Sequence, residues 1–325
     1  MPELAKRRSV RYKGTEIITT PLLLPSFSSK GFPYVDKIIK TCEEFISEEI
    51  LVSCYDLYYG KIQAPFTFPS CIFLDSGGYE ASKEQELSDV GDKPHKPNKW
   101  DRKKHEEVLA TWPEDVPTIY ISYDNPQERV AIPLQIERAL EMAKKRPGLL
   151  REILIKPESP DSTYIKIESL LDNVPSLHPF AVIGVTEKEI GRSFQERMEN
   201  IARLRRELMK RGMETPIHIF GSLDTISSPL YFVAGADIFD GLTWLRYAYY
   251  NGNTIYRQNY GALALGLGTR AEIVEGQCWS NNYHYLMKLR DQMRAYINTG
   301  DFSVFAHHST TIQNAYKAIS PTVGV

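Results

Sequence analysis

Seven short apolar runs, separated by segments with helical periodicity, constrain the fold of this chain more than any other feature. Most of them are apolar at consecutive positions, which is typical of strands in a parallel sheet covered on both faces. The runs are Ile50–Cys54, Cys71–Asp75, Thr118–Asp124, Glu152–Lys156, Phe180–Val185, Pro216–Gly221 and Ala236–Gly241. Strands that alternate with helices in this way form either a closed barrel or an open doubly wound sheet.

The barrel is favoured because no GxGxxG follows the first apolar run, which removes the commonest doubly wound fold. Seven or eight βα units in 325 residues, without a break in composition, predict an α/β protein built on a (β/α)8 barrel of the TIM type. We expect a single domain over residues 1–325, with the barrel over about 11–265 and a C-terminal helical extension over about 281–320.

For two helices the sequence contains residues that mark where the helix begins or ends. The segment Ser193–Lys210 begins with the spacing of a capping box, completed by Glu196, and Gly212 stands where a glycine commonly follows a helix. A last helix is predicted over Asn281–Asn298, with Gly300 ending it. Both segments are apolar on one side, as a helix that packs against a sheet must be.

The composition excludes some classes of protein. The formal net charge of −2 gives no global signal for nucleic-acid binding. No apolar run is long enough to cross a bilayer, so we expect a cytoplasmic protein without a membrane partner. The four cysteines form no CxxC pair, so no zinc knuckle or redox motif is visible, and neither a metal nor a cofactor is expected.

Aspartates close three of the apolar runs, at Asp75, Asp124 and Asp240. In a barrel these strand ends share one rim, so residues far apart in the sequence converge on one pocket. The polar segment Glu84–Lys104 is expected to form a long βα loop on the same side. A single aspartate in this position is often a helix cap or turn former, but three at one rim favour a functional site.

Two converging carboxylates suit chemistry at the anomeric carbon of a sugar. One attacks C1′ while the other handles the proton of the leaving group. An aspartate nucleophile is ionised at neutral pH and needs no activating base. The residue types alone therefore support glycosyl transfer or hydrolysis, without identifying the sugar.

Four segments, in the same order along the chain, resemble the tRNA-guanine transglycosylase superfamily. Leu74–Tyr79 (LDSGGY) is similar to the family's DSGG-aromatic motif, and Gly235–Asp240 (GADIFD), followed by Arg246, is similar to its nucleophile segment. Thr19–Phe27 (TTPLLLPSF) resembles the opening TP-x-x-x-P stretch, and His284–Phe305 resembles the last helix with its G-x-F-x-x-F close. The resemblance therefore covers most of the chain.

The resemblance implies a base exchange, in which guanine in a nucleic acid is replaced by a free 7-deazaguanine base through a covalent aspartyl-sugar intermediate. It implies that Asp240 is the nucleophile that attacks C1′ and that Asp75 is the general acid/base for the departing and incoming bases. The target nucleotide would have to be unpaired or flipped out, because a stacked base is out of reach.

The same resemblance implies the residues that bind the substrate. Tyr79 would stack on the purine, and Asp124 would accept from N1–H and the exocyclic amine of guanine. The backbone of Gly184 would face the carbonyl edge of the base, and Arg246 would contact the nucleic-acid backbone. The residues expected to line the base pocket are Ser76, Gly77 and Gly78.

The chain departs from the family in the region that carries a zinc site. The cysteine trio and histidine of that site are missing, and the stretch between Asp240 and the last helix is too short for the zinc subdomain. In the family this subdomain helps to form the homodimer and to dock tRNA. The sequence therefore does not decide whether this chain forms a homodimer or whether its substrate is tRNA. It also leaves open whether a protein partner replaces the missing docking surface.

Other departures fall on the base pocket. Lys156 stands where relatives carry a base-reading glutamine, and a lysine cannot accept a hydrogen bond, which leaves the identity of the base open. His218 lies near a position where relatives place an apolar residue over the base, and it is interpreted as a core residue or a substrate contact. Tyr249, in the run Tyr247–Tyr250, replaces an expected arginine and either stacks on unpaired bases or packs against the barrel.

Three functions remain in competition at this level. The first is base exchange on tRNA or on DNA, since the family has a DNA-modifying branch and relatives beside 7-deazapurine genes in bacterial defence clusters. The second is a retaining glycosidase or N-glycosidase that uses the same carboxylates with water as acceptor, and Asp124 as a guanine-reading group argues against it. The third is a non-catalytic nucleic-acid-binding subunit, and the presence of both Asp75 and Asp240 argues against that.

Overall fold

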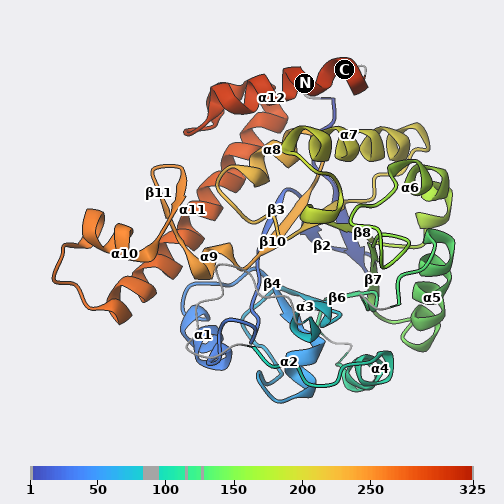
Figure 1. Ribbon diagram of the computed structural model, residues 1–325, viewed down its shortest axis with the longest axis horizontal. Helices are drawn as coiled ribbons and strands as arrows, with labels where there is room; N and C mark the ends of the chain where they lie inside the picture. The colour runs from blue at the N-terminus through green and yellow to red at the C-terminus, as the bar shows by residue number, and fades with distance from the viewer. Residues whose placement is uncertain (1–2, 83–94, 114–115, 126–127, 324–325) are drawn as a thin grey trace.

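A computed structural model describes residues 3–82, 95–113, 116–125 and 128–323, and its centre is an eight-stranded parallel sheet (Figure 1). The strands are β3 (Leu22–Pro25), β4 (Glu49–Ser53), β5 (Cys71–Asp75), β6 (Thr118–Ile121), β7 (Leu150–Ile155), β8 (Val182–Thr186), β9 (Ile217–Phe220) and β10 (Ile238–Gly241). Their order in the sheet is β3-β10-β9-β8-β7-β6-β5-β4. A parallel bridge between Ser26 and Leu51 joins β3 to β4, so the sheet closes on itself. The predicted TIM-type barrel is confirmed.

Helices cover the outside of the barrel and form its C-terminal extension (Figure 1). They are α1 (Val35–Cys42), α2 (Cys54–Tyr58), α3 (Gly78–Ala81), α4 (Arg102–Thr111), α5 (Ile132–Lys145), α6 (Ile167–Asn173), α7 (Phe194–Lys210), α8 (Ser227–Val233), α9 (Thr243–Arg246), α10 (Arg257–Tyr260), α11 (Ala271–Thr299) and α12 (Ser309–Val323). Single helical turns are η1 (Val174–Leu177), η2 (Glu187–Glu189), η3 (Gly261–Leu265) and η4 (Phe302–Val304). The last helix, α12, lies against α7 and α8.

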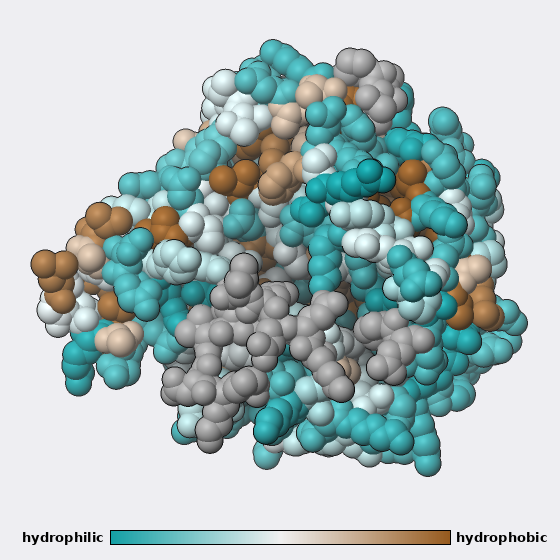
Figure 2. Space-filling model, in the orientation of Figure 1, coloured by the Kyte–Doolittle hydropathy of each residue, from teal (hydrophilic) through white to brown (hydrophobic). Residues whose placement is uncertain are grey.

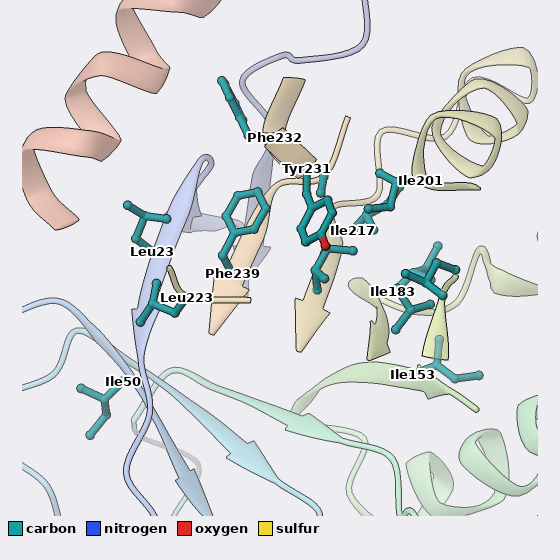
Figure 3. Close-up of a cluster of buried hydrophobic side chains, with 14 of the residues drawn as sticks. Leu23, Ile50, Ile153, Ile183, Ile201, Ile217, Leu223, Tyr231, Phe232 and Phe239 are labelled. Carbon is teal, nitrogen blue, oxygen red and sulfur yellow. The ribbon is translucent and has the colours of Figure 1, made fainter. Parts of the chain in front are cut away.

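Alternate residues of each strand point into the barrel or out toward the helices. The inner cluster contains Leu22, Leu24, Leu51, Phe73, Ile119, Ile121, Leu154, Val182 and Ile238. The outer cluster includes Leu23, Ile183, Ile217 and Phe239, and Figure 3 shows these side chains beside Ile201 of α7 and Tyr231 and Phe232 of α8. Because the period is two residues, Glu152, His218 and Asp240 belong to the inward-facing set.

A short antiparallel hairpin closes the barrel at the end opposite to the strand carboxyl ends. It consists of β1 (Ser9–Tyr12) and β2 (Thr15–Thr19). Its residues Val10 and Ile18 are buried in the inner cluster with Leu22 and Leu24. This hairpin therefore fills the lower end of the barrel, and the upper end is left for a pocket.

A buried ion cluster secures the same lower end. Asp237, immediately before β10, accepts from Arg8 Nη1 at 2.8 Å, from the backbone N–H of Ile217 at 2.8 Å, and from Arg205 Nη2 of α7. Arg8, Arg205 and Asp237 are all almost completely buried. The cluster ties the N-terminal segment and α7 to adjacent strands of the barrel.

The apolar runs predict the strands β4 to β10 to within a few residues, and Cys71–Asp75 matches β5 at both ends. Among the eight strands of the barrel, β3 has no predicted counterpart, because its apolar run is very short and lies between Pro21 and Pro25. The Thr118–Asp124 run ends as a strand at Ile121, so Asp124 lies in the following loop.

Both predicted helices are present, with the expected signals at their ends. Ser193 Oγ accepts from Glu196 N at 3.1 Å at the start of α7, and Gly212 follows that helix with φ +68°. The last predicted helix is part of α11, which starts at Ala271 rather than Asn281 and ends at Thr299. Gly300 follows in the left-handed conformation that ends many helices.

An arm projects from one side of the barrel, at the left of Figure 1. It contains the hairpin of β11 (Ala248–Tyr250) and β12 (Asn253–Ile255), then α10, η3 and the first turns of α11. Its tip is apolar, and Figure 2 shows brown side chains there. Tyr256, Leu263 and Leu267 are the exposed large apolar residues of the arm before α11. Within the described ranges, no helix combines the length and apolar character needed to span a membrane.

Candidate active site

A cavity of about 370 Å³ opens at the carboxyl ends of the barrel strands. Most of the residues that the sequence singles out line it, namely Asp75, Ser76, Gly78, Tyr79, Asp124, Lys156, Asp240 and Arg246. Gly77, Gly184, His218 and Tyr249 are not among the lining residues. The carboxyl ends of β5 and β10 therefore contribute to one cavity, as the barrel arrangement predicts.

Asp240 is held by hydrogen bonds to both oxygens of its carboxylate. Oδ1 accepts from the Gly221 N–H at 3.1 Å, and Oδ2 accepts from Ser26 Oγ at 2.8 Å. Ser26 Oγ itself accepts from the Gly241 N–H at 3.1 Å, which fixes the direction of its own hydrogen. The side chain is nearly buried, so the carboxylate faces the cavity in one fixed orientation.

Asp75 lies at the end of β5, and its Oδ2 accepts from the Gly77 N–H at 3.1 Å. Burial, followed by the negative charge of Glu80, raises the pKa of the Asp75 carboxyl to about 7, and the charge of Asp240 acts in the same direction. A carboxyl with this pKa exchanges a proton readily at neutral pH. The pair therefore combines a fixed carboxylate with a carboxyl that can carry a proton.

Two further buried acids adjoin Asp75, and the sequence analysis did not single them out. Glu80 accepts from Ser53 Oγ at 2.8 Å and from the hydroxyl of Ser28, and Asp56 Oδ2 accepts from the Ser29 N–H at 2.7 Å. Burial raises the pKa of Glu80 to about 7 and that of Asp56 to about 6. These acids keep negative charge close to Asp75 and so favour its protonated form.

The two glycines after Ser76 are required by close contacts. A side chain at Gly77, whose φ is +85°, would place its Cβ 2.7 Å from Tyr55 Cβ and 3.0 Å from Trp100 Nε1. At Gly78 the Cβ would lie 3.0 Å from Asp124 Oδ2. The glycines thus let Trp100 and Asp124 approach the turn after β5.

The predicted loop Glu84–Lys104 falls partly outside the described residues, which resume at residue 95. Its second half packs over the turn after β5. Trp100 Nε1 donates to Ser76 O at 2.9 Å, and the Asn98 N–H donates to Tyr55 OH at 2.7 Å. The described half of the segment therefore packs against the turn after β5 and α2, and its last residues belong to α4.

Asp124 lies among positive charges on a wall of the cavity next to the turn after β5. Arg129 Nη1 donates to Asp124 Oδ1, and Lys156 Nζ lies 3.6 Å from Asp124 Oδ2. Lys156 also donates to Thr186 Oγ1 at 2.9 Å and lies 2.6 Å from Glu189 Oε2. This wall thus presents a carboxylate acceptor and an ammonium donor side by side.

Tyr79 stands between two cations. Lys30 Nζ lies 4.3 Å from the centre of its ring, and Arg246 Nη2 donates to Tyr79 OH at 2.7 Å. Lys30 is almost fully buried and also donates to the backbone oxygen of Tyr79 at 3.2 Å. These contacts fix the ring at the edge of the cavity.

The predicted residues that do not line the cavity lie behind or beside it. His218 is fully buried next to Asp240, and Gly184 is packed against Glu152 and Phe220, where a Cβ would meet atoms at 2.5 and 2.6 Å. Tyr249 is 1% exposed and donates to Leu223 O at 2.7 Å, so it packs against the barrel instead of presenting its ring to a ligand.

The histidine, cysteine and acidic side chains of the described residues are not grouped as metal ligands. Among the described residues, no group of three or more histidine, cysteine, aspartate or glutamate side chains is arranged to hold a metal ion. The four cysteines are buried and form no disulfide.

No family model matches this chain, and no curated protein matches it. The barrel and the arrangement of charged side chains around its cavity are therefore the observations from which a function is inferred.

Proposed function

We propose that this chain is a base-exchange transglycosylase that replaces guanine in a nucleic acid by a free 7-deazaguanine base. The observation that carries the proposal is the pair of Asp240 and Asp75 at one cavity. Asp240 is oriented through both carboxylate oxygens, and the raised pKa of Asp75 suits it to give and take a proton. These are the two roles that substitution at C1′ of a nucleotide requires.

The proposed reaction has two halves that balance. Asp240 attacks C1′ and the C1′–N9 bond breaks, while Asp75 gives its proton to an imidazole-ring nitrogen of the departing guanine. The incoming base then loses its N9 proton to Asp75 and attacks C1′, and Asp240 leaves as a carboxylate. The products are free guanine and a nucleic acid with the new base, and Asp75 is again protonated.

The wall formed by Asp124 and Lys156 supports a guanine-type base. The Watson–Crick edge of guanine offers two donors, N1–H and the exocyclic amine, beside the acceptor O6. In the proposed complex Asp124 Oδ2 accepts from the donors, and Lys156 Nζ donates to O6. A lysine in place of the family's glutamine is compatible with this contact because O6 needs a donor.

Tyr79 is placed to stack on the same base. Lys30 lies 4.3 Å from the centre of the Tyr79 ring, and Tyr79 lines the cavity, so in the proposed complex the purine stacks on this ring. Stacking of this kind contributes about 1–3 kcal/mol per base. Arg246, which holds Tyr79 OH and lines the cavity, would contact the phosphate backbone of the target strand.

Incubation of the protein with radiolabelled guanine or a 7-deazaguanine base, and with tRNA or DNA of its source organism, tests the proposal. Label should enter one of the two polymers, and that polymer is the substrate. With the free base withheld, a denaturing gel should show a covalent protein–nucleic acid adduct. Release of guanine without incorporation would indicate a hydrolase instead. Binding without release or incorporation would indicate a non-catalytic subunit.

The two half-reactions should depend on pH in opposite ways. The first needs Asp75 protonated, so kcat/KM for the nucleic acid should fall as pH rises through about 7. The second needs it deprotonated, so kcat/KM for the free base should fall as pH drops through the same range. In Glu80→Gln the neighbouring charge is lost and the pKa of Asp75 decreases, so both profiles should move to lower pH. Two profiles with the same slope would contradict the role of Asp75.

Gly78→Ala should weaken binding of the free base. The new Cβ would lie 3.0 Å from Asp124 Oδ2 and displace the carboxylate that reads N1–H. We expect the KM for the base to rise about tenfold, which corresponds to ~1.4 kcal/mol. Gly268→Ala is the control, because nothing lies within 4 Å of its Cβ position. Equal KM values in the two variants would argue against Asp124 as a base contact.

A further inference from the structure

Two buried side chains, Glu152 and His218, form a chain of contacts that leads to Asp240, the proposed nucleophile, from inside the barrel. Glu152 on β7 and His218 on β9 are both fully buried, and His218 Nδ1 lies 2.8 Å from Glu152 Oε1. On the other side of the ring, His218 Nε2 lies 3.2 Å from Asp240 Oδ1 as an ion-pair contact. Strand periodicity turns all three side chains inward, directly below the cavity.

The surroundings of the imidazole ring are otherwise apolar. Phe220 stacks on His218 with ring centres 3.9 Å apart, and Phe73 meets its edge at 5.9 Å. Gly184 on β8 lies beside Glu152, with no room for a larger side chain. Among the contacts of His218 in the described chain, Glu152 and Asp240 are the titratable groups that face it.

These surroundings decide the charge of His218. Burial by itself lowers the pKa of the imidazole, but the charge of Glu152 and the contact with Asp240 outweigh it and raise that pKa to about 9. Glu152 Oε2 has no hydrogen-bond partner within the described ranges, so His218 is its compensating charge. This raised pKa favours the imidazolium form of His218 at neutral pH, with Nε2 toward Asp240, while burial also raises the pKa of Glu152.

We propose that Glu152 keeps His218 positively charged and that this buried cation promotes release of the sugar from Asp240 in the second half of the exchange. The inference rests on the proposed base exchange and adds a positioning pair to it. Neither Glu152 nor His218 needs to touch the substrate. Both act through the carboxylate of Asp240.

The hydrogen bonds of Asp240 show why the cation favours this step. Oδ2 has one donor, Ser26 Oγ, whereas Oδ1 has the Gly221 N–H and faces His218 Nε2. Attack through Oδ2 forms the C1′–Oδ2 bond and leaves Oδ1 as the ester carbonyl. When the incoming base breaks that bond, the electron pair returns to Asp240 and negative charge develops beside the imidazolium. A fixed cation at that place stabilises the departing carboxylate.

Glu152→Gln tests the inference because it keeps the shape and removes the charge. Without Glu152⁻ the pKa of the buried His218 should fall, and a neutral ring would face Asp240. We expect turnover near pH 7.5 to drop about 100-fold, with the covalent adduct accumulating because its breakdown slows more than its formation. The ratio of variant to wild-type turnover should rise as pH falls toward 5.5–6, where His218 takes up a proton. The ratio is compared because protonation of Asp75 slows the second half-reaction in both proteins at low pH. Glu48→Gln is the control, since it removes an ion pair with Arg290 at the opposite end of β4.

The charge of His218 has a readout that does not depend on activity. In protein with ¹⁵N-labelled histidine, His218 should show two protonated ring nitrogens at pH 7.5, and Glu152→Gln should lose this signature. His218→Gln assigns the signals. If Glu152→Gln does not fold, His218→Gln is used in its place. In His218→Gln the covalent adduct should accumulate, and its breakdown should not become faster at low pH.

The outcomes separate this inference from the proposed function. A neutral His218 in the wild type would overturn the inference whatever the activity. Normal exchange in both variants, or equal slowing of adduct formation and breakdown, would overturn it and leave base exchange in place. An absence of both exchange and adduct in the wild type would overturn the proposed function and, with it, the role in sugar release.

Discussion

Asp240→Asn is expected to reduce base exchange by a factor of about 10⁴ or more and to eliminate the covalent adduct. Asparagine has the same shape and still accepts a hydrogen bond from the Gly221 N–H, so the pocket should persist. An uncharged amide does not attack C1′, so neither the covalent adduct nor exchange should form through this residue. Label incorporation and denaturing gels measure the two effects.

Asp172→Asn is the matched control for that variant. Asp172 is an exposed carboxylate on α6, outside the cavity, so its loss should leave exchange and adduct unchanged. Both variants should melt close to the wild type. A persistent adduct in Asp240→Asn would show that another residue attacks the sugar.

Asp237→Ala should cause the largest loss of stability among the variants considered. Removal of this carboxylate leaves the buried guanidinium groups of Arg8 and Arg205 without their shared counter-charge. Leaving such charges uncompensated costs about 3–5 kcal/mol, compared with less than about 1 kcal/mol for an exposed ion pair. The free energy of unfolding, measured by denaturant titration, should fall by that amount.

Glu214→Ala provides the comparison on the same arginine. Glu214 lies 3.1 Å from Arg8 Nε, but its side chain is 61% exposed, so its loss should change stability little. Asp237 lies just before the start of β10, whereas Asp240 lies near the end of that strand, at the cavity. The folded fraction of Asp237→Ala should therefore retain its exchange rate. Similar losses of stability in both variants would contradict the role of burial.

The barrel could be predicted because most of its strands are runs of consecutive apolar residues. β5 matches its predicted range, and α7 has the capping interaction that Ser193 and Glu196 predict. β3 was not predicted because its apolar run is very short, and the β1–β2 hairpin was not predicted because its strands lack consecutive apolar residues. β3 is placed by pairing with β10, more than 200 residues later, which no local window contains.

The rim aspartates could be predicted for a similar reason. Asp75 and Asp240 end apolar runs, so their position follows from strand topology alone. Ser26, Glu152 and Glu80 act on these aspartates but have no motif of their own. The two-residue period does place Ser26 after inward Leu24 and Glu152 before inward Leu154, so that signal was available. The burial of Glu80 depends on three-dimensional packing and could not be read from the sequence.

The side chain that orients the nucleophile comes from the segment that completes the barrel. Ser26 bridges to Leu51 where the sheet closes, and it donates to Asp240, 214 residues further along the chain. During synthesis β3, the first barrel strand, can therefore pair with β10, the last one, only after β10 has been made. The closed barrel and the oriented carboxylate of Asp240 both depend on that pairing. Under the proposed function, a partly folded intermediate in which β3 and β10 are unpaired would lack the hydrogen bond from Ser26 to Asp240 and should be inactive. If the chain has the proposed activity, recovery of that activity during refolding should therefore require the pairing of β3 with β10.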